Sequence, residues 1–330
     1  MKKVRWGIIS TANIAQTQVI PAMFRAENAE VAAIASRSEK VHAIAKSLGI
    51  PKAYESYEAL LDDPEIDAVY IPLPNHLHRE WTIGAARKGK HVLCEKPAAL
   101  NAHEAAEMVR ICEEQQVLFM EAFMYQLHPQ HDRVKEIIAS GEIGELKLMK
   151  SSHAFYLGDR STNIRATKDW GGGSLYDVGC YCIHAIRQIT ESEPVAVQAS
   201  AQLDSVSGID LTALVQLELK NGVRAVFDCS FDTVPRNEYE IVGTTGTIKV
   251  PYAFRPDLQG GTGSIIVSAN GETREERVDG DLYRLEIEHF SAAILDGTPI
   301  SVTGQSTIDN MRVIEACLRA VVSGKRESVE

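Results

Sequence analysis

Hydrophobic residues in the first third of the chain fall into short continuous runs that alternate with longer amphipathic segments. Such runs indicate strands covered on both faces, as in a parallel sheet. The expected strands are Val4–Ile9, Val31–Ala35, Ala68–Ile71, His91–Cys94 and Val117–Met120. The expected helices, bounded by Gly, Pro or capping residues, are Asn13–Arg25, Ser38–Leu48, His76–Lys88 and Asn101–Gln115. This alternation predicts an α/β Rossmann domain with a parallel sheet, which we place at residues 1–122.

The pattern changes after a helical segment at Gln130–Ala139, because apolar residues then recur at every second position. Two such strands place on one face Leu211, Ala213, Val215, Leu217 and Leu219, then Val223, Ala225, Phe227, Cys229 and Phe231. Asn221-Gly222 between them predicts a hairpin with a type I′ turn, and Asn270-Gly271 marks a second hairpin. We therefore predict an α+β domain at residues 123–330 with a large open, mainly antiparallel sheet.

Three helices are expected beside this sheet, at Gly173–Thr190, Leu282–Leu295 and Ile308–Val322, with the first two packed on one of its faces. Leu, Val and Phe on the opposite face would form a large apolar patch. We therefore expect a homodimer or homotetramer that pairs through the open sheet.

The charge balance favours a small-molecule partner. The 330 residues include 34 Lys and Arg against 45 Asp and Glu, which gives a net charge of −11. This sign opposes binding to nucleic acid or to an anionic membrane surface. No apolar stretch approaches the length of a membrane span, and the N-terminal residues lack the apolar region of a secretory signal, so we expect a cytoplasmic protein.

The cysteines indicate buried thiols and neither disulfides nor a metal centre. All six lie scattered in apolar segments, which suits reduced thiols. Cys180, Cys182 and His184 fall on a predicted helix, where residues two apart point to different sides and do not converge on one ion. His76 and His78 lack a nearby third ligand. We therefore predict no metal site.

Two segments at predicted strand ends indicate a cofactor site, since parallel sheets bind ligands beyond the carboxyl ends of their strands. Lys96, in Glu95-Lys96-Pro97, follows the strand at His91–Cys94, although an ordinary surface lysine is the alternative. The turn after the first strand places Ser10, Ala12 and Ala15 where a dinucleotide fingerprint has glycines. Small residues and the Ser10 and Thr11 hydroxyls still suit a pyrophosphate at a helix N-terminus, although a plain strand–turn–helix remains open.

The end of the second strand favours NADP over NAD, which remains possible. It carries Ser36-Arg37-Ser38 in place of the acidic residue that binds the ribose hydroxyls of NAD. A guanidinium pairs with a 2′-phosphate, whereas a carboxylate repels it. A solvated arginine is the alternative.

A second cluster lies in Asp169–His184, where a glycine run opens a helix and lets the backbone pass close to a ligand. Asp177, Tyr181 and His184 have the spacing of one helical face. Burial of three such polar groups is costly unless they meet partners or a substrate. A hydrogen-bonded core network is the other interpretation.

These motifs, with Pro72–His78, Asn163-Ile164-Arg165, Gly171–Tyr181 and Gly243–Ile248, resemble the Gfo/Idh/MocA family of sugar oxidoreductases over nearly the whole chain. The likeness is greatest to its NADP-dependent D-xylose and dihydrodiol dehydrogenase branch. It implies NAD(P)-dependent oxidation or reduction at a CH–OH group of a sugar, polyol or cyclic diol. It also implies that Lys96 and Tyr181 act at the reacting hydroxyl with Asp177 in support.

We accordingly expect Tyr181 to be the acid/base, with Lys96 donating a hydrogen bond to the substrate oxygen and Asp177 orienting the pair. Arg165 and His184 are candidate substrate contacts. The expected cofactor-binding residues are Ser10, Thr11, Ala12, Asn13, Ile14, Ser36, Arg37, Pro72, Leu73, Asn75, His78, Glu95 and Lys96. Two alternatives stay open, an NAD-linked inositol or polyol dehydrogenase and a non-catalytic NADP-binding regulator.

Overall fold

The computed structural model describes residues 2–330, which form two compact units. The first unit contains the residues up to Met124 together with Tyr283–Ile308, and the second contains Tyr125–Leu282 together with Asp309–Glu330. The predicted boundary between residues 122 and 123 lies two residues before this division. The predicted second domain, however, holds Tyr283–Ile308, which the contacts group with the first unit.

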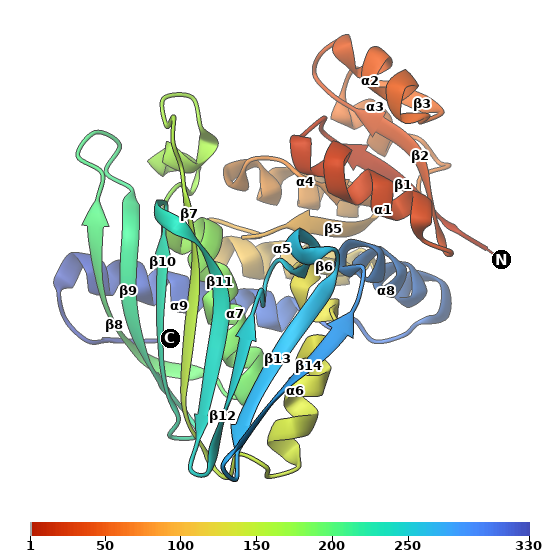
Figure 1. The fold of residues 1–330 in the computed structure, drawn as a ribbon. Coiled ribbons are helices and arrows are strands. Elements are labelled where there is room, and N and C mark those ends of the chain that lie inside the picture. Colours follow the sequence, from red (N-terminus) through yellow and green to blue (C-terminus); the bar gives the residue numbers. More distant parts are fainter. Residues whose placement is uncertain (1) are drawn as a thin grey trace. The chain divides into compact units, whose positions relative to one another are not determined.

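The first unit is built on a six-stranded sheet in the order β3-β2-β1-β4-β5-β6, and every paired neighbour is parallel (Figure 1). This is the strand order of a Rossmann fold, so the predicted fold class is confirmed. The strands are β1 (Val4–Ile9), β2 (Ala29–Ala35), β3 (Lys52–Tyr54), β4 (Ala68–Ile71), β5 (His91–Glu95) and β6 (Phe119–Ala122). The helices are η1 (Ala15–Val19), α1 (Ile20–Arg25), α2 (Lys40–Leu48), α3 (Tyr57–Leu61), α4 (Asn75–Arg87), α5 (Ala102–Glu114) and α8 (Leu282–Asp296).

Two short elements of the first unit, β3 and α3, were not predicted. They have three and five residues, too few to show either a strand or a helix period. The start of α5 was easier to predict, because Asn101 caps it by accepting a hydrogen bond from the Glu104 N–H at 2.8 Å. The Glu104 side chain reaches back to the N–H of Leu100 at 3.1 Å.

Helix α8 belongs to the first unit, although we expected it to pack against the antiparallel sheet. The indole N–H of Trp6, on β1, donates to Ser291 Oγ at 3.2 Å. The Trp6 and Phe290 rings lie 5.8 Å apart, and both side chains are fully buried. Trp6 is a long apolar side chain that cannot be covered by the local βα units alone, so a distant helix completes the core.

The second unit contains a nine-stranded sheet in the order β14-β13-β12-β11-β7-β10-β9-β8-β15. Every pairing is antiparallel except that of β7 with β10, so the sheet is mainly antiparallel as predicted. Its strands are β7 (Leu146–Tyr156), β8 (Pro194–Leu203), β9 (Asp210–Leu219), β10 (Arg224–Ser230), β11 (Asp232–Gly243), β12 (Gly246–Pro251), β13 (Thr262–Ala269), β14 (Glu272–Asp279) and β15 (Glu327–Ser328). The other elements are η2 (Met124–Leu127), α6 (Gln130–Ala139), η3 (Ile164–Ala166), η4 (Lys168–Trp170), η5 (Leu175–Gly179), α7 (Cys180–Thr190), η6 (Pro256–Gln259) and α9 (Gly304–Ser323).

The two predicted hairpins differ in their turns. Asn270 and Gly271 have φ angles of 56° and 80°, as a type I′ turn between β13 and β14 requires. Between β9 and β10 only Gly222 has a positive φ, of 86°, so the predicted type I′ turn at Asn221-Gly222 is wrong although the hairpin is present. Asn221 Oδ1 instead accepts a hydrogen bond from the N–H of Val223 at 3.1 Å. This local bond holds a longer loop.

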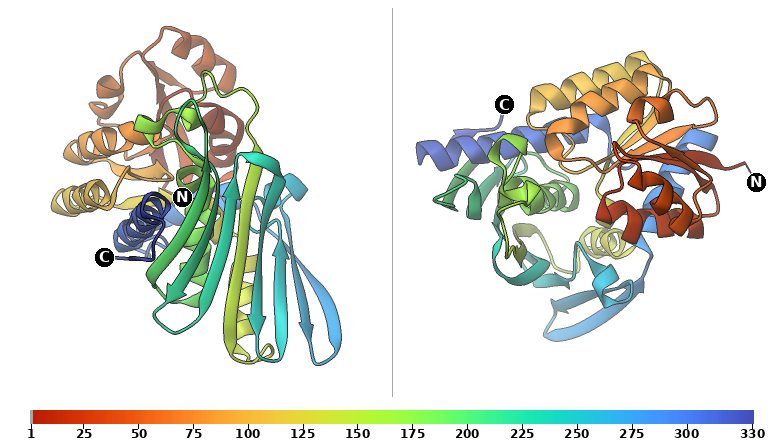
Figure 2. Two further views of the ribbon diagram at one scale, coloured as in Figure 1. Left: turned by 90° about the vertical axis from the view of Figure 1, so that its left-hand side faces the viewer. Right: turned by 90° about the horizontal axis from the view of Figure 1, so that it is seen from above.

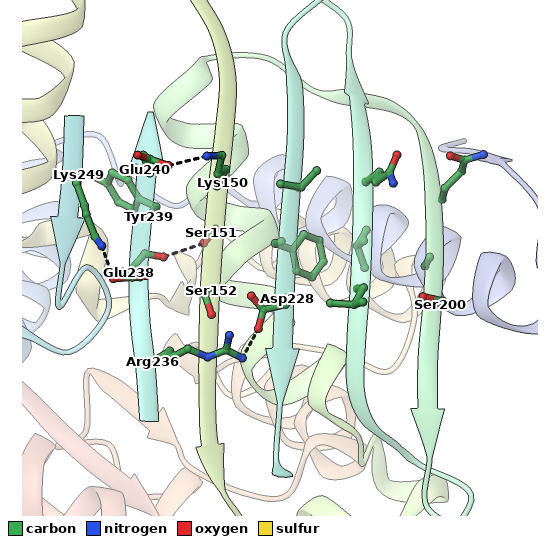
Figure 3. Close-up of a pocket in the computed structure, with 17 residues that line it drawn as sticks. Lys150, Ser151, Ser152, Ser200, Asp228, Arg236, Glu238, Tyr239, Glu240 and Lys249 are labelled. Carbon is green, nitrogen blue, oxygen red and sulfur yellow. Dashed lines mark hydrogen bonds and ion pairs between the residues drawn. The ribbon is translucent and has the colours of Figure 1, made fainter. Parts of the chain in front are cut away.

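The large sheet has one buried apolar face and one open face of mixed polarity. The predicted inward residues of β9 and β10 are buried, and α6 and α7 lie on that side of the sheet (Figure 2). The open face forms a hollow of about 650 Å³ (Figure 3). Polar and charged side chains that line the hollow are Lys150, Ser152, Gln198, Ser200, Gln216, Asp228, Arg236, Glu238, Glu240 and Lys249. Leu214, which is 59% exposed, and Val226 lie among these polar side chains, so the predicted apolar surface is present in part.

Across residues 2–330, the helices are all too short or too polar to traverse a lipid bilayer.

Candidate active site

The first unit gathers the predicted cofactor residues at one edge of its sheet. Ser10 follows β1, Ser36 follows β2, Pro72 follows β4, and Glu95 ends β5. The carboxyl ends of parallel strands share one edge, so these four segments face the same crevice. The structure thus brings together residues that are up to about 85 positions apart in the sequence.

The turn after β1 has a glycine-like backbone angle at Ser10, although the glycines of the fingerprint are absent. Ser10 has a φ of 128°, a conformation that glycine adopts readily and other residues rarely. Its Oγ accepts a hydrogen bond from the N–H of Ala12 at 3.0 Å. Helical structure begins at Asn13, and a π-helical stretch at Ala15–Val19 follows. A helix N-terminus at this place suits an anionic group.

Arg37, two residues after β2, is exposed and has neither an ion pair nor a hydrogen bond within residues 2–330. Its guanidinium carbon lies 5.1 Å from the ring centre of Tyr57 and 5.6 Å from that of Trp81. The N–H donors of this group are therefore available to an anion, as a 2′-phosphate requires.

His78 holds the segment after β4. Its ring is fully buried, with Nε2 2.7 Å from the carbonyl oxygen of Leu73 and Nδ1 2.9 Å from that of Pro97. Burial lowers the pKa of His78 to about 4, so the ring is neutral and donates to one of these carbonyls at pH 7. The predicted contact of His78 with the cofactor stays a prediction. The His78 ring links the segments after β4 and β5.

The segment that carries Lys96 is fixed on both sides. The Lys96–Pro97 peptide bond is cis. Glu95 accepts a hydrogen bond from the buried hydroxyl of Tyr70 at 2.5 Å, and the N–H of Ala98 donates to Glu121 Oε1 at 2.9 Å. Glu121 is 1% exposed, and no motif in the sequence pointed to it. A lysine between two such anchors has a defined backbone position.

In the second unit, the glycine run serves packing inside the protein. A Cβ at Gly172 would lie 2.6 Å from the carbonyl oxygen of Arg165, and one at Gly173 would overlap the carboxylate of Asp210. Asp210 accepts hydrogen bonds from Ser174 Oγ and the N–H of Leu175, both at 2.7 Å. It is 5% exposed, and burial raises its pKa to about 6. Sequence reasoning missed this carboxylate, which anchors the start of the helix that carries Asp177 and Tyr181.

Asp177 and Arg165, predicted in different roles, form an ion pair. Arg165 Nε lies 2.7 Å from Asp177 Oδ2, and the guanidinium lies 5.9 Å from the ring centre of Phe155. The Arg165 side chain is 40% exposed and that of Asp177 is 14% exposed. The pair therefore offers hydrogen-bonding groups at the surface of the second unit.

Tyr181, on α7, lies in a cluster of rings. Its ring centre is 5.0 Å from that of His153, 5.6 Å from that of Phe254 and 5.7 Å from that of Tyr125. His153 also stacks on Phe254 at 4.9 Å. These neighbours come from separate parts of the chain and carry no motif, so they were not predicted. They fix the orientation of the Tyr181 ring.

His184 lies in the core of the second unit. It is fully buried, and its Nδ1 lies 2.6 Å from the hydroxyl of Tyr125. Burial holds its pKa well below the ordinary value. The core-network interpretation fits this position, and the predicted contact of His184 with the substrate stays a prediction. Lys96 and Tyr181 belong to different units, and their pairing at one oxygen remains a prediction.

No group of three or more His, Cys, Asp or Glu side chains in the described part of the chain is arranged to hold a metal ion. The six cysteines are free and buried.

Comparisons with known proteins agree with this architecture. Residues 4–123 match the oxidoreductase family with an NAD-binding Rossmann fold, and residues 131–249 match the GFO/IDH/MocA C-terminal domain. The NADP(+)-dependent D-xylose 1-dehydrogenase 2 of Haloferax volcanii is 40% identical over 97% of this chain and 98% of its own. A trans-1,2-dihydrobenzene-1,2-diol dehydrogenase of Xenopus laevis is 32% identical over 75% of each chain.

A solved structure shares the fold over nearly its full length. It is a 3-ketoreductase from Actinomadura kijaniata in complex with NADP and TDP-benzene, with a TM-score of 0.89 and 29% identity, and the match covers 97% of this chain and 98% of that one. The Rossmann strand order, the second, mainly antiparallel sheet and these matches agree over both units. The chain therefore belongs to the Gfo/Idh/MocA family of oxidoreductases.

Proposed function

We propose that the protein is an NADP-linked dehydrogenase or reductase that acts on a secondary alcohol or anomeric hydroxyl of a sugar, polyol or cyclic diol. The observation that carries this proposal is the Arg165–Asp177 ion pair at the start of the helix that bears Tyr181. A phenol and a carboxylate four residues apart, with a guanidinium bound to the carboxylate, provide proton transfer and hydroxyl binding together. The names of the relatives, a D-xylose dehydrogenase and a diol dehydrogenase, support this substrate class.

The first unit has the features that a dinucleotide needs. The glycine-like backbone of Ser10 and the helix that begins at Asn13 suit the pyrophosphate. Thr11 and Ala12 belong to the same turn, and Ile14 lies in the first turn of the helix. Ser36 adds a hydroxyl beside Arg37, and Arg37 suits the 2′-phosphate. Leu73 and Asn75 lie beside the pyrophosphate segment at the carboxyl end of β4. When bound, NADP supplies the nicotinamide that takes up or releases the hydride.

Tyr181 takes or returns the proton of the reacting hydroxyl in this proposal. Lys96 donates a hydrogen bond to the same oxygen, and its positive charge favours the ionised phenol. The anchors Glu95, Glu121 and His78 keep the segment around Lys96 in place. Asp177 orients Arg165, whose guanidinium contacts other hydroxyl groups of the substrate.

A Lys96→Met variant tests the proposal. We expect kcat for the best substrate to fall by about 10²- to 10⁴-fold, because the group that polarises the reacting oxygen is lost. The Kd for NADPH should stay unchanged. The substrate is first found by following NADPH absorbance with a panel of aldopentoses, aldohexoses, inositols and diols.

Lys46→Met is the matched control, since Lys46 is an exposed lysine on α2 of the same unit. Unaltered turnover in Lys96→Met would reject the role of Lys96. NADPH binding without turnover of any member of the panel would favour the non-catalytic regulator, and preference for NADH with inositols would favour the NAD-linked dehydrogenase.

The open face of the second unit supports a further part of this proposal, that the protein is a homodimer or homotetramer. Its hollow carries both signs of charge, including Lys150 paired with Glu240, and an exposed Leu214. A surface with both signs can pair with its own copy across a two-fold axis. We expect sedimentation to show an oligomer that Leu214→Glu weakens and Leu203→Glu does not. Leu203 is equally exposed but lies outside the hollow, and a monomeric wild-type protein would reject the proposal.

We also propose a cytoplasmic location. The six buried, free thiols suit a reducing compartment. Cell fractionation tests this, and recovery outside the cytoplasm would contradict it.

A further inference from the structure

The guanidinium of Arg37 rests on two aromatic rings, Tyr57 and Trp81, which we call the aromatic shelf. The guanidinium carbon is 5.1 Å from the first ring centre and 5.6 Å from the second. Both separations lie within the range in which a cation is attracted to a ring face. The two residues come from different helices, Tyr57 from the first residue of α3 and Trp81 from α4.

The shelf itself is rigid. The two rings meet edge to face at 4.8 Å with an angle of 84° between their planes, and Tyr57 and Trp81 are 7% and 4% exposed. Ser56 caps α3 by accepting a hydrogen bond from the N–H of Ala59 at 3.1 Å, which fixes the entry of Tyr57. The indole N–H of Trp81 has no acceptor within residues 2–330, so packing and not hydrogen bonding holds this ring.

Arg37 contributes no structural ion pair that would explain its place. Its side chain is exposed and its N–H groups are unpaired within the described residues, while its guanidinium carbon lies within cation–π distance of both shelf rings. A guanidinium held by aromatic rings through cation–π attraction still has its N–H donors for an anion. A free arginine must give up considerable rotamer freedom to bind, and a stacked one has already given up part of it.

We propose that Tyr57 and Trp81 are specificity-determining positioning residues that hold Arg37 ready for the 2′-phosphate of NADP. This inference rests on the proposed NADP-linked function. The shelf acts only through Arg37, so its effect falls on cofactors that carry the 2′-phosphate and leaves NADH untouched.

Arg37→Lys gives the first test. Lysine keeps the positive charge but loses the planar face that stacks on the shelf. We expect the ratio of the NADH Kd to the NADPH Kd, measured by cofactor fluorescence, to fall at least about tenfold, with the NADH Kd unchanged. Arg37 is exposed, so the substitution does not threaten folding. Full retention of the ratio would show that charge alone sets the preference and would overturn the proposal.

Substitution of the two shelf residues themselves gives the second test. Trp81→Leu and Tyr57→Leu should each weaken NADPH binding by about three- to tenfold, and Trp81→Phe, which keeps a ring, should restore most of it. Since both residues are buried, the NADH Kd in the same variants serves as the internal control. A merely structural defect would weaken both cofactors equally and would overturn the proposal.

A double variant separates the shelf from the cofactor assignment. In the Arg37→Ala background, Trp81→Leu should have no further effect on NADPH binding, because the shelf then has nothing to hold. If Arg37→Ala removes the NADPH preference but the shelf variants leave it intact, the shelf proposal fails alone. If the wild-type protein does not prefer NADPH, or Arg37→Ala leaves the preference unchanged, the NADP assignment itself fails.

Discussion

Ser10 in the first unit and Gly173 in the second have nearly the same unusual backbone angle, with φ values of 128° and 116°. Each stands just before a helix that carries predicted functional residues, and each helix contains a π-helical stretch. Only the second position carries a glycine. At Ser10 there is room for a side chain, which bonds to the N–H of Ala12, whereas at Gly173 a Cβ would overlap the Asp210 carboxylate.

The comparison shows that a positive φ does not by itself require glycine. The strain of such an angle costs roughly 1–3 kcal/mol, and a local hydrogen bond offsets part of that cost. What excludes a side chain at Gly173 is the buried neighbour. A search for the glycines of the fingerprint therefore misses the turn after β1. There the glycine-like backbone angle is present, although the residue is a serine.

Gly173→Ala is the most severe way to test this contrast. We expect a loss of more than about 3 kcal/mol in the free energy of unfolding, because the backbone angle stays strained and the added methyl group displaces the Asp210 carboxylate from its two donors. Urea denaturation measures the loss. Gly141→Ala is the control, since Gly141 has a similar φ of 77° but nothing within 4 Å of an added Cβ. Equal losses in the two variants would contradict the role given to the Asp210 carboxylate.

The raised pKa of Asp210 predicts that the free energy of unfolding depends on pH. The expected change is nearly as large as that in Gly173→Ala. Burial raises the pKa of its carboxyl from 3.8 to about 6, so the folded state holds the proton more tightly than the unfolded state. Stability from this residue is fully present below pH 4 and is lost as pH rises to 6, by about 3 kcal/mol. The buried His78, with its pKa lowered to about 4, acts in the opposite sense over an overlapping range.

The measurement must therefore isolate Asp210. In the wild-type protein both donors use one oxygen, Oδ2, and an asparagine oxygen can accept from both. We expect the difference in unfolding free energy between Asp210→Asn and the wild-type protein to grow in favour of Asn between pH 4 and pH 6. A difference that stays constant over this interval would show that Asp210 does not titrate there.

The contrast between local backbone signals and contacts with other segments also explains which features could be predicted from the sequence. Strands β1 and β4 match their predicted ranges to the residue, because a continuous apolar run is a local signal. The Asp210 anchor and the His153 contact with Tyr181 depend on residues brought together from separate segments, and the Arg165–Asp177 pair joins a loop to a helix. No local pattern predicts any of the three. His78 and His184 look like ligand-binding residues by type and position, yet their burial gives them internal partners.

Ser10→Gly should have the smallest effect, although it changes the first position of the cofactor turn. The substitution relieves about 1–3 kcal/mol of backbone strain, loses one hydrogen bond worth about 1 kcal/mol and adds up to about 1 kcal/mol of freedom to the unfolded chain. These contributions nearly cancel, so we expect a change within about 1 kcal/mol. Ser10→Ala keeps the strain and loses the bond, and should cost about 1 kcal/mol.

Cofactor binding adds a second measurement at this position. In the wild-type protein the N–H of Ala12 is occupied by Ser10 Oγ, and Ser10→Gly releases it at the helix N-terminus. An unpaired N–H there is a donor for a pyrophosphate, so the Kd for NADPH should stay the same or decrease. A loss of stability above about 2 kcal/mol together with weaker NADPH binding would mean that the serine side chain is required. The turn after β1 would then resemble the turn at Gly173, in that its neighbours and not its backbone angle dictate the residue.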